Sequence, residues 1–383
     1  MNFQFLLPTK IVMQAGLRAR TGEHLKELGL RHVLLVTDAG VKRAGLLESI
    51  YTSLDAAQVR YAEVCDVKPN PRSDDCNATA QKYRGQGIDG VLAVGGGSAM
   101  DAAKAISVLL THEGNVEDYE GAFTLKNPAL PIIAIPTTAG TGSEVTFFSV
   151  ITDTQRQFKM SILDYRIGPV LALLDSDITA TLPPAIAAST GMDALTHAIE
   201  AYTCKLANPI SDGLALHAIR LISQNLKAAV QEPENQAARE QMLIASLIAG
   251  MAFGNADIAS VHCISEAIGG MYDTPHGVGN AIFLPFVFSH NRDADLRRHA
   301  DVAYALGIDP TLDAATAAER AVEQLFSMSK ELGIPRFSKV AGVREEDFQA
   351  IAEKSKSNMS DSSNAKPMSV DSYLTIIRQA YQH

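Results

Sequence analysis

The sequence predicts two domains: an α/β domain with a parallel sheet over residues 1–180 and an all-helical domain over residues 181–383. The first half alternates short runs of branched apolar residues with helical patterns, which is typical of a mostly parallel sheet covered on both faces. After Asp175 the pattern changes and little strand signal follows. A chain of 383 residues is long enough for two domains.

Five segments of the first half are expected to form strands. They are apolar and rich in β-branched residues, and they end at polar or glycine-containing turns. The segments are HVLLVTD (32–38), VRYAEVCD (59–66), GVLAV (90–94), PIIAI (131–135) and GPVLALLDSDIT (168–179).

The second half is expected to be helical because its apolar residues recur with a helical period and its residues favour helices. The clearest segments are residues 177–204, which enter through Thr-Leu-Pro-Pro, then 237–253 and 312–333. The polar stretch SKSNMSDSSNAKPMS (355–369) is interpreted as a surface loop before a last helix.

Composition excludes several classes of function. The formal net charge of −10 disfavours nucleic acid and anionic membranes as partners. No stretch is apolar for the length a bilayer needs, and the first apolar run is short, lacks a basic flank and is broken by Pro8. The four cysteines form no CxxC pair, which suits a reducing compartment. We therefore expect a cytoplasmic protein.

A glycine turn, Gly95-Gly96-Gly97-Ser98, lies between a predicted strand and a predicted helix. Glycines there let backbone N–H groups approach an anion, and the helix dipole favours negative charge. Asp101 in the first helical turn also suits the dipole. A plain tight turn is the alternative interpretation.

Two further features favour a dinucleotide. The loop PTTAGTGSE (136–144) offers glycines and hydroxyl groups after a strand, and two such loops at strand ends suit a diphosphate in the crevice beyond the sheet. Asp38 ends the first strong strand, where a carboxylate can accept hydrogen bonds from a ribose 2′-OH and repel a 2′-phosphate. This favours NAD over NADP, although Asp38 alone could equally be a helix or turn cap.

Four side chains of the helical half predict a metal site. Asp193 and His197 are four residues apart, so on a helix they share one face. His262 and His276 add two imidazoles, and His276 follows a proline, outside a regular helix interior. One carboxylate and three imidazoles suit Fe(II) or Zn(II), and the carboxylate leans towards the harder ion. Each of these histidines, taken alone, would more often be a hydrogen-bonded core or loop residue than a metal ligand.

These motifs give the chain a specific resemblance. It resembles the iron-containing, or group III, alcohol dehydrogenase family essentially from end to end. The resemblance is carried by GGGSAMDAAKAI (95–106), IPTTAGTGSEVT (135–146), GMDALTHAIEAY (191–202), VHCISEAIGGMYDTPHGVGNAIFLP (261–285) and, more faintly, NAKP (364–367).

The resemblance implies an N-terminal dinucleotide-binding domain, a C-terminal metal-binding domain and an active site in the cleft between them. It implies a metal- and NAD-dependent alcohol dehydrogenase or aldehyde reductase that transfers hydride between a small alcohol and NAD. Asp193, His197, His262 and His276 match the metal ligands, with Fe(II) favoured and Zn(II) the alternative. Phe148 and Phe253 match positions of the substrate pocket. Positions near the cofactor are matched by Asp38, Asn70, Gly96, Gly97, Ser98, Thr137, Thr138, Thr141 and Lys159.

One residue departs from the family pattern. Many members carry a second histidine one turn after the third ligand, where this chain has Glu266. The family histidine is usually seen as a non-ligand that assists proton transfer or substrate placement. Glu266 could be a proton relay, an extra metal ligand or a substrate contact. The alternative is a hydrogen bond to a neighbouring residue, with no chemical role.

Three other functions share some of these features. A dehydroquinate-synthase-like lyase shares NAD and a metal but needs Lys and Arg residues around the metal, and the flanking segments contain almost none. Glycerol dehydrogenase is a zinc-dependent relative with three protein ligands and different motifs. A non-catalytic NAD or metal sensor is the third. By analogy with the family, we expect a homo-oligomer, a dimer or larger.

Overall fold

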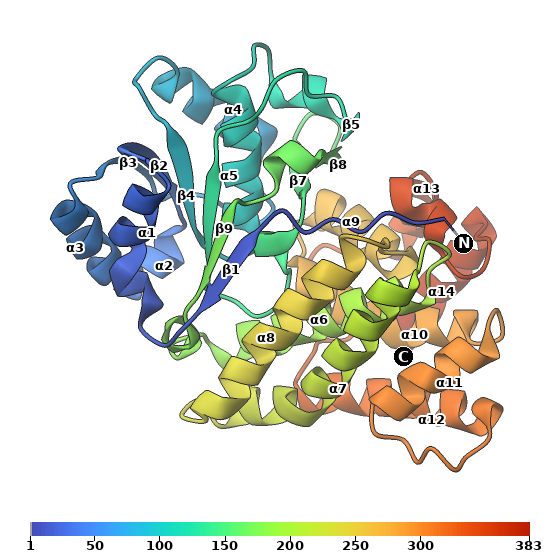
Figure 1. Cartoon of the computed structure of the whole chain (residues 1–383). Helices are drawn as coiled ribbons and strands as arrows, with labels where there is room; N and C mark the ends of the chain where they lie inside the picture. Colours follow the sequence, from blue (N-terminus) through green and yellow to red (C-terminus); the bar gives the residue numbers. More distant parts are fainter. Residues whose placement is uncertain (1) are drawn as a thin grey trace. The chain divides into compact units, whose positions relative to one another are not determined.

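The computed structural model describes residues 2–383, which divide into two compact units (Figure 1). The α/β unit contains residues 7–138 and 143–182, and the helical unit contains residues 183–383 together with residues up to 6 and 139–142. Within the described residues, none of the helices is long and apolar enough to cross a membrane.

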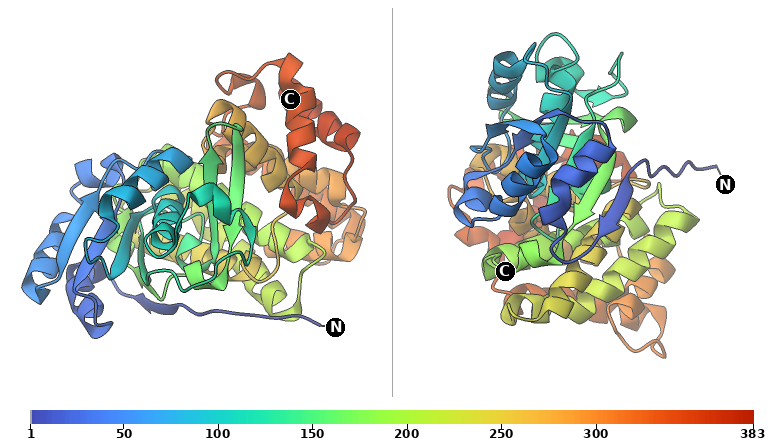
Figure 2. Two further views of the ribbon diagram at one scale, coloured as in Figure 1. Left: turned by 90° about the horizontal axis from the view of Figure 1, so that it is seen from above. Right: turned by 60° about the vertical axis from the view of Figure 1, so that its left-hand side comes forward.

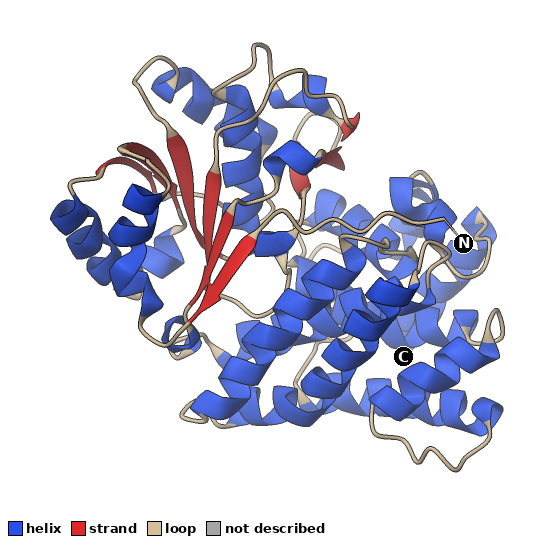
Figure 3. Ribbon diagram, viewed as in Figure 1, coloured by secondary structure: helices blue, strands red, loops and turns tan. Residues whose placement is uncertain are grey.

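The α/β unit contains every strand of the described chain (Figure 3). Its strands are β1 (Lys10–Met13), β2 (His32–Val36), β3 (Arg60–Val64), β4 (Gly90–Gly95), β5 (Gly121–Ala122), β6 (Ile132–Pro136), β7 (Phe148–Asp153), β8 (Phe158–Leu163) and β9 (Leu171–Leu174). Its helices are α1 (Thr21–Glu27), α2 (Ala39–Arg43), α3 (Glu48–Ala57), α4 (Ser73–Tyr83) and α5 (Gly97–Leu109).

The main sheet is entirely parallel, with strand order β1-β9-β6-β4-β2-β3. All five expected strands belong to it. The apolar runs of β2, β4, β6 and β9 are buried because helices cover both faces, whereas β3 lies at the edge and is only partly buried. Helices α4 and α5 share one core with residues such as Leu34 and Val91, whereas α1 and α3 share another with Val33 and Leu92. The two pairs of helices lie on opposite faces of the sheet (Figures 1 and 2).

The strand order reverses between β2 and β4, because β3 lies beside β2 and the chain then crosses to the other side. Ligands of open parallel sheets bind beyond the carboxyl ends of the strands at such a switch point. Asp38 follows β2 and the glycine turn follows β4. The topology therefore places both predicted cofactor elements at this end of the sheet.

A second sheet was not predicted. Strands β7 and β8 form an antiparallel hairpin, and β5 pairs with β8 in parallel. Ile151, Met160 and Ile162 of the hairpin join the same core as α5. The hairpin therefore covers the side of α5 that the main sheet leaves open.

The helical unit has no strand among its described residues. Its helices are α6 (Pro184–Thr203), α7 (Pro209–Gln231), α8 (Gln236–Phe253), α9 (Ser260–Tyr272), α10 (His276–Asn291), α11 (Leu296–Ala305), α12 (Ala314–Glu331), α13 (Phe348–Lys356) and α14 (Val370–Gln382). Helices α6, α7 and α8 pack against one another, and α10 packs on α6 and α9.

The polar stretch 355–369 is not the surface loop that its composition suggested. It contains a short 3-10 helix, η8 (Met359–Ser363), and Ser360, Asp361, Ser363 and Asn364 are buried. Their polar atoms are bonded inside the unit; Asp361, for example, accepts a 2.8 Å hydrogen bond from the Tyr373 hydroxyl. Composition alone could not reveal these partners, which lie elsewhere in the chain.

Candidate metal centre and cofactor-binding turns

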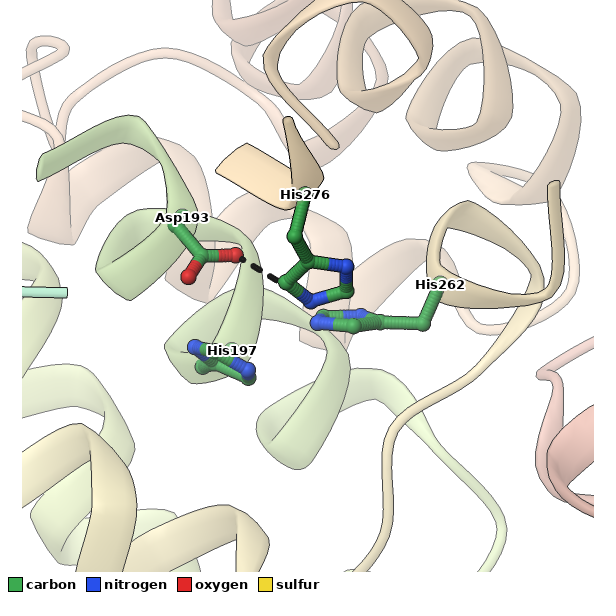
Figure 4. Close-up of side chains that lie close together, drawn as sticks. All are labelled: Asp193, His197, His262 and His276. Carbon is green, nitrogen blue, oxygen red and sulfur yellow. Dashed lines mark ion pairs between the residues drawn. The ribbon is translucent and has the colours of Figure 1, made fainter. Parts of the chain in front are cut away.

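Three helices bring the predicted metal ligands together. Asp193 and His197 lie one turn apart on α6, His262 lies in the first turn of α9, and His276 is the first residue of α10. One ligand atom from each residue lies within 4.8 Å of the others, and the four side chains converge in Figure 4. The Asp193 Oδ1–His276 Nε2 distance is 3.7 Å.

The cluster fits a single transition-metal ion. Donor atoms bound to one ion at about 2.1 Å lie roughly 3–4 Å apart in tetrahedral geometry. Asp193, His197 and His262 are buried, so an ion would be shielded from water on those sides. Burial lowers the pKa of His197 to about 4, which keeps this imidazole in the neutral form that binds metals.

The start of α10 lies very close to two neighbouring helices, α6 and α9. A Cβ added to Gly277 would lie 2.5 Å from the Ser189 carbonyl oxygen on α6, and one added to Gly279 would lie 2.5 Å from Ser265 Oγ on α9. Ser265 also donates a 3.0 Å hydrogen bond to the His276 carbonyl. The glycines of PHGVG therefore let the start of α10, which carries His276, approach both helices.

Two polar residues around the cluster were missed from the sequence. The Asn280 amide Nδ2 donates to Asp193 Oδ1 at 2.6 Å and lies 3.0 Å from His262 Nε2 and 3.2 Å from His276 Nε2. Glu200 accepts a 2.6 Å hydrogen bond from His262 Nδ1. Burial raises the pKa of Glu200 to about 7, although hydrogen bonds from backbone N–H groups near the start of α9 partly offset this rise. Glu200 follows His197 by three residues, the one signal that could have drawn attention to it.

Phe253 and Glu266 also belong to the helical unit. The Phe253 ring stacks on the His197 imidazole, with centroids 4.3 Å apart. Glu266 is buried on α9, one turn after His262, and Asn358 Nδ2 donates a 2.6 Å hydrogen bond to Glu266 Oε2. The cluster of potential metal ligands among the described residues does not include Glu266.

The glycine turn lies at the start of α5. Gly96 is the N-cap, Gly96 to Ser98 are only partly buried, and no side chain among the described residues caps this helix. Close neighbours come from the adjacent strands: Thr138 lies 3.2 Å from a Cβ added to Gly96, and Asp38 lies 3.4 Å from one added to Gly95. Helix N–H groups without a capping side chain suit an anion.

The other predicted cofactor residues occupy varied positions. Asp38 caps α2, and its Oδ1 accepts from the backbone N–H groups of Gly40 and Val41. Thr137 is buried after β6 and its N–H donates to the Gly95 carbonyl. Asn70 is buried with a left-handed φ of 53°. Thr141 belongs to the helical unit.

Three predicted residues lie around α5 and the hairpin. The Asp101 carboxylate accepts hydrogen bonds from Ser143 Oγ and the Val150 N–H, so it anchors the hairpin; its cofactor role remains a prediction. Lys159 is buried on β8. Phe148 begins β7 and stacks on Phe147.

Comparison with known proteins assigns the fold and cluster to a family. The model of the iron-containing alcohol dehydrogenases matches residues 8–176, and that of the C-terminal region of the same family matches residues 187–381. The chain belongs to the iron-containing alcohol dehydrogenase family. This family uses NAD and an iron ion.

Individual relatives agree over the whole chain. The 1,3-propanediol dehydrogenase of Klebsiella pneumoniae is 39% identical over 382 residues, 99% of each chain. The NAD-dependent methanol dehydrogenase of Bacillus methanolicus is 36% identical and covers 98% of this chain and 99% of its own. A crystal structure of a 1,3-propanediol oxidoreductase superposes with a TM-score of 0.95 at 39% identity, covering 99% of this chain and 100% of its own.

These findings confirm the predicted family, fold class and enzyme class. The protein is an oxidoreductase of the iron-containing alcohol dehydrogenase type, which interconverts an alcohol and an aldehyde with NAD. The comparisons support neither the lyase nor the sensor considered above.

Proposed function

We propose that Asp193, His197, His262 and His276 hold a divalent metal in this alcohol dehydrogenase. The observation that carries the proposal is the convergence of their four donor atoms within 4.8 Å. Fe(II) is favoured by the family and Zn(II) suits the same donor set. When bound, the metal supplies Lewis acidity that lowers the pKa of an alcohol, and NAD accepts the hydride.

The α/β unit is proposed to bind NAD. Backbone N–H groups of Gly96, Gly97 and Ser98 face the diphosphate at the start of α5, and Thr137 and Thr138 offer hydroxyl groups. Thr141, which belongs to the helical unit, is proposed to offer another. Asp38 Oδ1 already caps α2, so Asp38 Oδ2 is the oxygen proposed to accept from a ribose hydroxyl. Asn70, Asp101 and Lys159 complete the proposed cofactor set.

The substrate is proposed to be a small alcohol or aldehyde. Phe253 lies against His197 and would offer an apolar face beside the carbinol carbon, and Phe148 is proposed as a second residue that contacts the substrate. Cytoplasmic location and a homo-oligomeric state are proposed from the sequence and from analogy with the family.

Glu266 is proposed to contact the substrate. Asn358 Oδ1 accepts from the Ser360 N–H at 2.9 Å, which turns the amide Nδ2 towards the Glu266 carboxylate. This carboxylate is therefore held in place on the same helix face as His262. A fixed, buried acceptor favours alcohols that carry a second hydrogen-bond donor over purely apolar ones. A proton relay is the competing role.

Metal reloading tests the proposed ligands. Anaerobically purified wild type, His276→Ala and His217→Ala would be stripped, reloaded with Fe(II) or Zn(II), and assayed by NADH absorbance with short alcohols and aldehydes. We expect His276→Ala to lose both metal and activity. His217→Ala should retain both, because His217 is exposed on α7. Loaded wild type that turns over no alcohol or aldehyde would contradict the proposed function.

A substitution at Glu266 separates its two roles. Glu266→His restores the residue type common in the family, and it should change which substrate is preferred while the best rate stays similar. Equal loss of rate for every substrate, at unchanged metal content, would instead assign Glu266 to the proton path. The panel should include diols and charged alcohols alongside apolar ones of equal length.

A further inference from the structure

Glu200 lies on the helix face that carries two of the proposed ligands. It follows Asp193 by seven residues and His197 by three, so all three side chains share one side of α6. The side chain is buried, with 3% exposed. A buried carboxylate is costly unless its oxygens accept hydrogen bonds, and these oxygens do.

Three donors from the start of α9 meet the Glu200 carboxylate. Oε1 accepts from the Val261 N–H at 2.7 Å, and Oε2 accepts from the Ala259 N–H at 2.9 Å and from His262 Nδ1 at 2.6 Å. The first N–H groups of a helix have no partner inside the helix. Glu200 therefore fixes both the beginning of α9 and the imidazole of its first turn.

The contacts on both sides of the His262 ring agree on one tautomer. Both oxygens of the Glu200 carboxylate act as acceptors, because each already accepts from a backbone N–H group. His262 Nδ1 must therefore carry the proton of the hydrogen bond to Glu200. On the other side of the ring, the Asn280 amide lies 3.0 Å from Nε2. The same Asn280 atom donates to Asp193 Oδ1, so it is the NH₂ nitrogen of the amide. Because this group is a donor, its contact with His262 requires a lone pair, and no proton, on Nε2.

We propose that Glu200 is a positioning residue of the metal centre, which holds the proton of His262 on Nδ1 and turns the unprotonated Nε2 towards the other ligands. The inference rests on the metal-ligand set proposed above. A ligand histidine whose second nitrogen donates to a carboxylate is fixed in tautomer and orientation and is a stronger base towards the metal.

Glutamine at position 200 would reverse this arrangement. Its amide nitrogen is a donor, so if it faces His262 it requires a lone pair on Nδ1 and a proton on Nε2, the atom that must bind the metal. If the amide oxygen faces His262 instead, the amide nitrogen faces the Val261 N–H, so two donors meet and that hydrogen bond is lost. Aspartate keeps the charge but is one methylene shorter, so it should preserve part of the contact.

The test compares wild type with Glu200→Gln, Glu200→Asp and the control Asp212→Asn. Asp212 is a half-buried carboxylate of the same unit that pairs with Arg298, away from the ligands. Zn(II) affinity of the stripped, full-length proteins would be measured by competition with a chromophoric chelator. The tautomer of His262 would be read from ¹⁵N chemical shifts of histidine-labelled, metal-free protein, assigned with His262→Asn.

We expect Glu200→Gln to weaken Zn(II) binding by about 10- to 100-fold and to move the His262 proton to Nε2. Glu200→Asp should bind with intermediate affinity, and Asp212→Asn should match wild type. Unchanged affinity in folded Glu200→Gln would overturn the inference. So would an Nε2-protonated His262 in metal-free wild type, a result that needs no variant to fold. Failure of wild type to bind Zn(II) would instead refute the metal centre, and the inference with it.

Discussion

At the scale of single residues, Asp38 has a structural role with which any cofactor role must coexist. Its Oδ1 caps α2, and a serine at an N-cap performs this function nearly as well as an aspartate. Asp38→Ser therefore removes the charge while keeping the cap. We expect the ratio of kcat/KM for NAD to that for NADP to fall by at least about tenfold, because the repulsion of a 2′-phosphate is lost.

The control for this prediction is Asp313→Ser. Asp313 caps α12 through the same pair of backbone contacts, to Ala315 and Thr316, so the substitution repeats the chemistry outside the α/β unit. It should leave the cofactor ratio unchanged. If Asp38→Ser also left the ratio unchanged at wild-type stability, Asp38 would be a cap alone.

The buried carboxyl of Glu144 is expected to make the stability of the protein depend on pH. It is buried in η3 (Ser143–Val145), and burial raises its pKa from 4.5 to about 7. The folded protein therefore holds this proton more tightly than the unfolded chain. Between about pH 4.5 and 7, the contribution of this group to stability falls as pH rises, and it is lost above about pH 7.

Glu144→Gln should remove that dependence. Relative to wild type, the free energy of unfolding of the variant should rise progressively between pH 4.5 and 7, by up to about 3 kcal/mol. The magnitude follows because a shift of one pKa unit corresponds to about 1.4 kcal/mol. Unfolding midpoints at pH 5, 6, 7 and 8 measure the difference. Glu319→Gln, an exposed position on α12, should show none. Parallel pH curves for wild type and Glu144→Gln would contradict the prediction.

Sequence patterns could predict that Asp193, His197, His262 and His276 cluster, but not which groups contact them. The four-residue spacing of Asp193 and His197 indicates that they share one face of a helix, and the family motifs identify His262 and His276. Glu200 contacts a histidine 62 positions away and Asn358 contacts a glutamate 92 positions away. Such pairs depend on tertiary packing, which local periodicity does not encode.

At the scale of helices and strands, the entry of α10 decides whether His276 reaches the cluster. A Cβ at Gly277 would lie 2.5 Å from the Ser189 carbonyl oxygen and 3.3 Å from Asp193 Cβ. The obstacle is backbone, so α10 itself must move. Gly277→Ala should destabilise the protein by about 1–3 kcal/mol and weaken Zn(II) binding, measured by thermal unfolding and chelator competition.

Gly213→Ala is the matched control. Gly213 lies inside α7 with no atom within 4 Å of an added Cβ, so alanine should stabilise its helix by about 0.5–1 kcal/mol without changing metal affinity. Equal effects of the two substitutions would show that the close approach of α10 to α6 is unimportant for the site.

The β7–β8 hairpin shows where element prediction failed. FSVITD and FKMSIL (148–153 and 158–163) contain polar residues among apolar ones, unlike the continuous apolar runs of β4, β6 and β9 in the main sheet. The second sheet is a small mixed one with one antiparallel pair, whereas parallel strands covered on both faces give a stronger signal in the sequence. Alternation with a period of two was the available clue.

At the scale of the whole molecule, the proposed sites divide between the two units. All four proposed metal ligands belong to the helical unit, whereas the glycine turn, Thr137 and Thr138 belong to the α/β unit. Residues 139–142 cross into the helical unit, where Gly142 lies against Gly250 of α8. A single boundary drawn along the sequence cannot describe such an excursion, because four residues are too few to carry their own pattern.

This division predicts that the two ligands protect different parts of the chain from hydrogen exchange. Adding Zn(II) to stripped protein should slow exchange in α6, α9 and the first turns of α10, since a ligand that binds only the native site stabilises the segments that form it. NAD should slow exchange in the β4–α5 turn and around residues 136–138. Asp193→Asn should lose the Zn(II) effect while retaining the NAD effect, which separates a damaged metal site from a damaged fold. If Zn(II) instead protected the β4–α5 turn and left α6 and α9 unchanged, the metal would not bind where the four side chains converge.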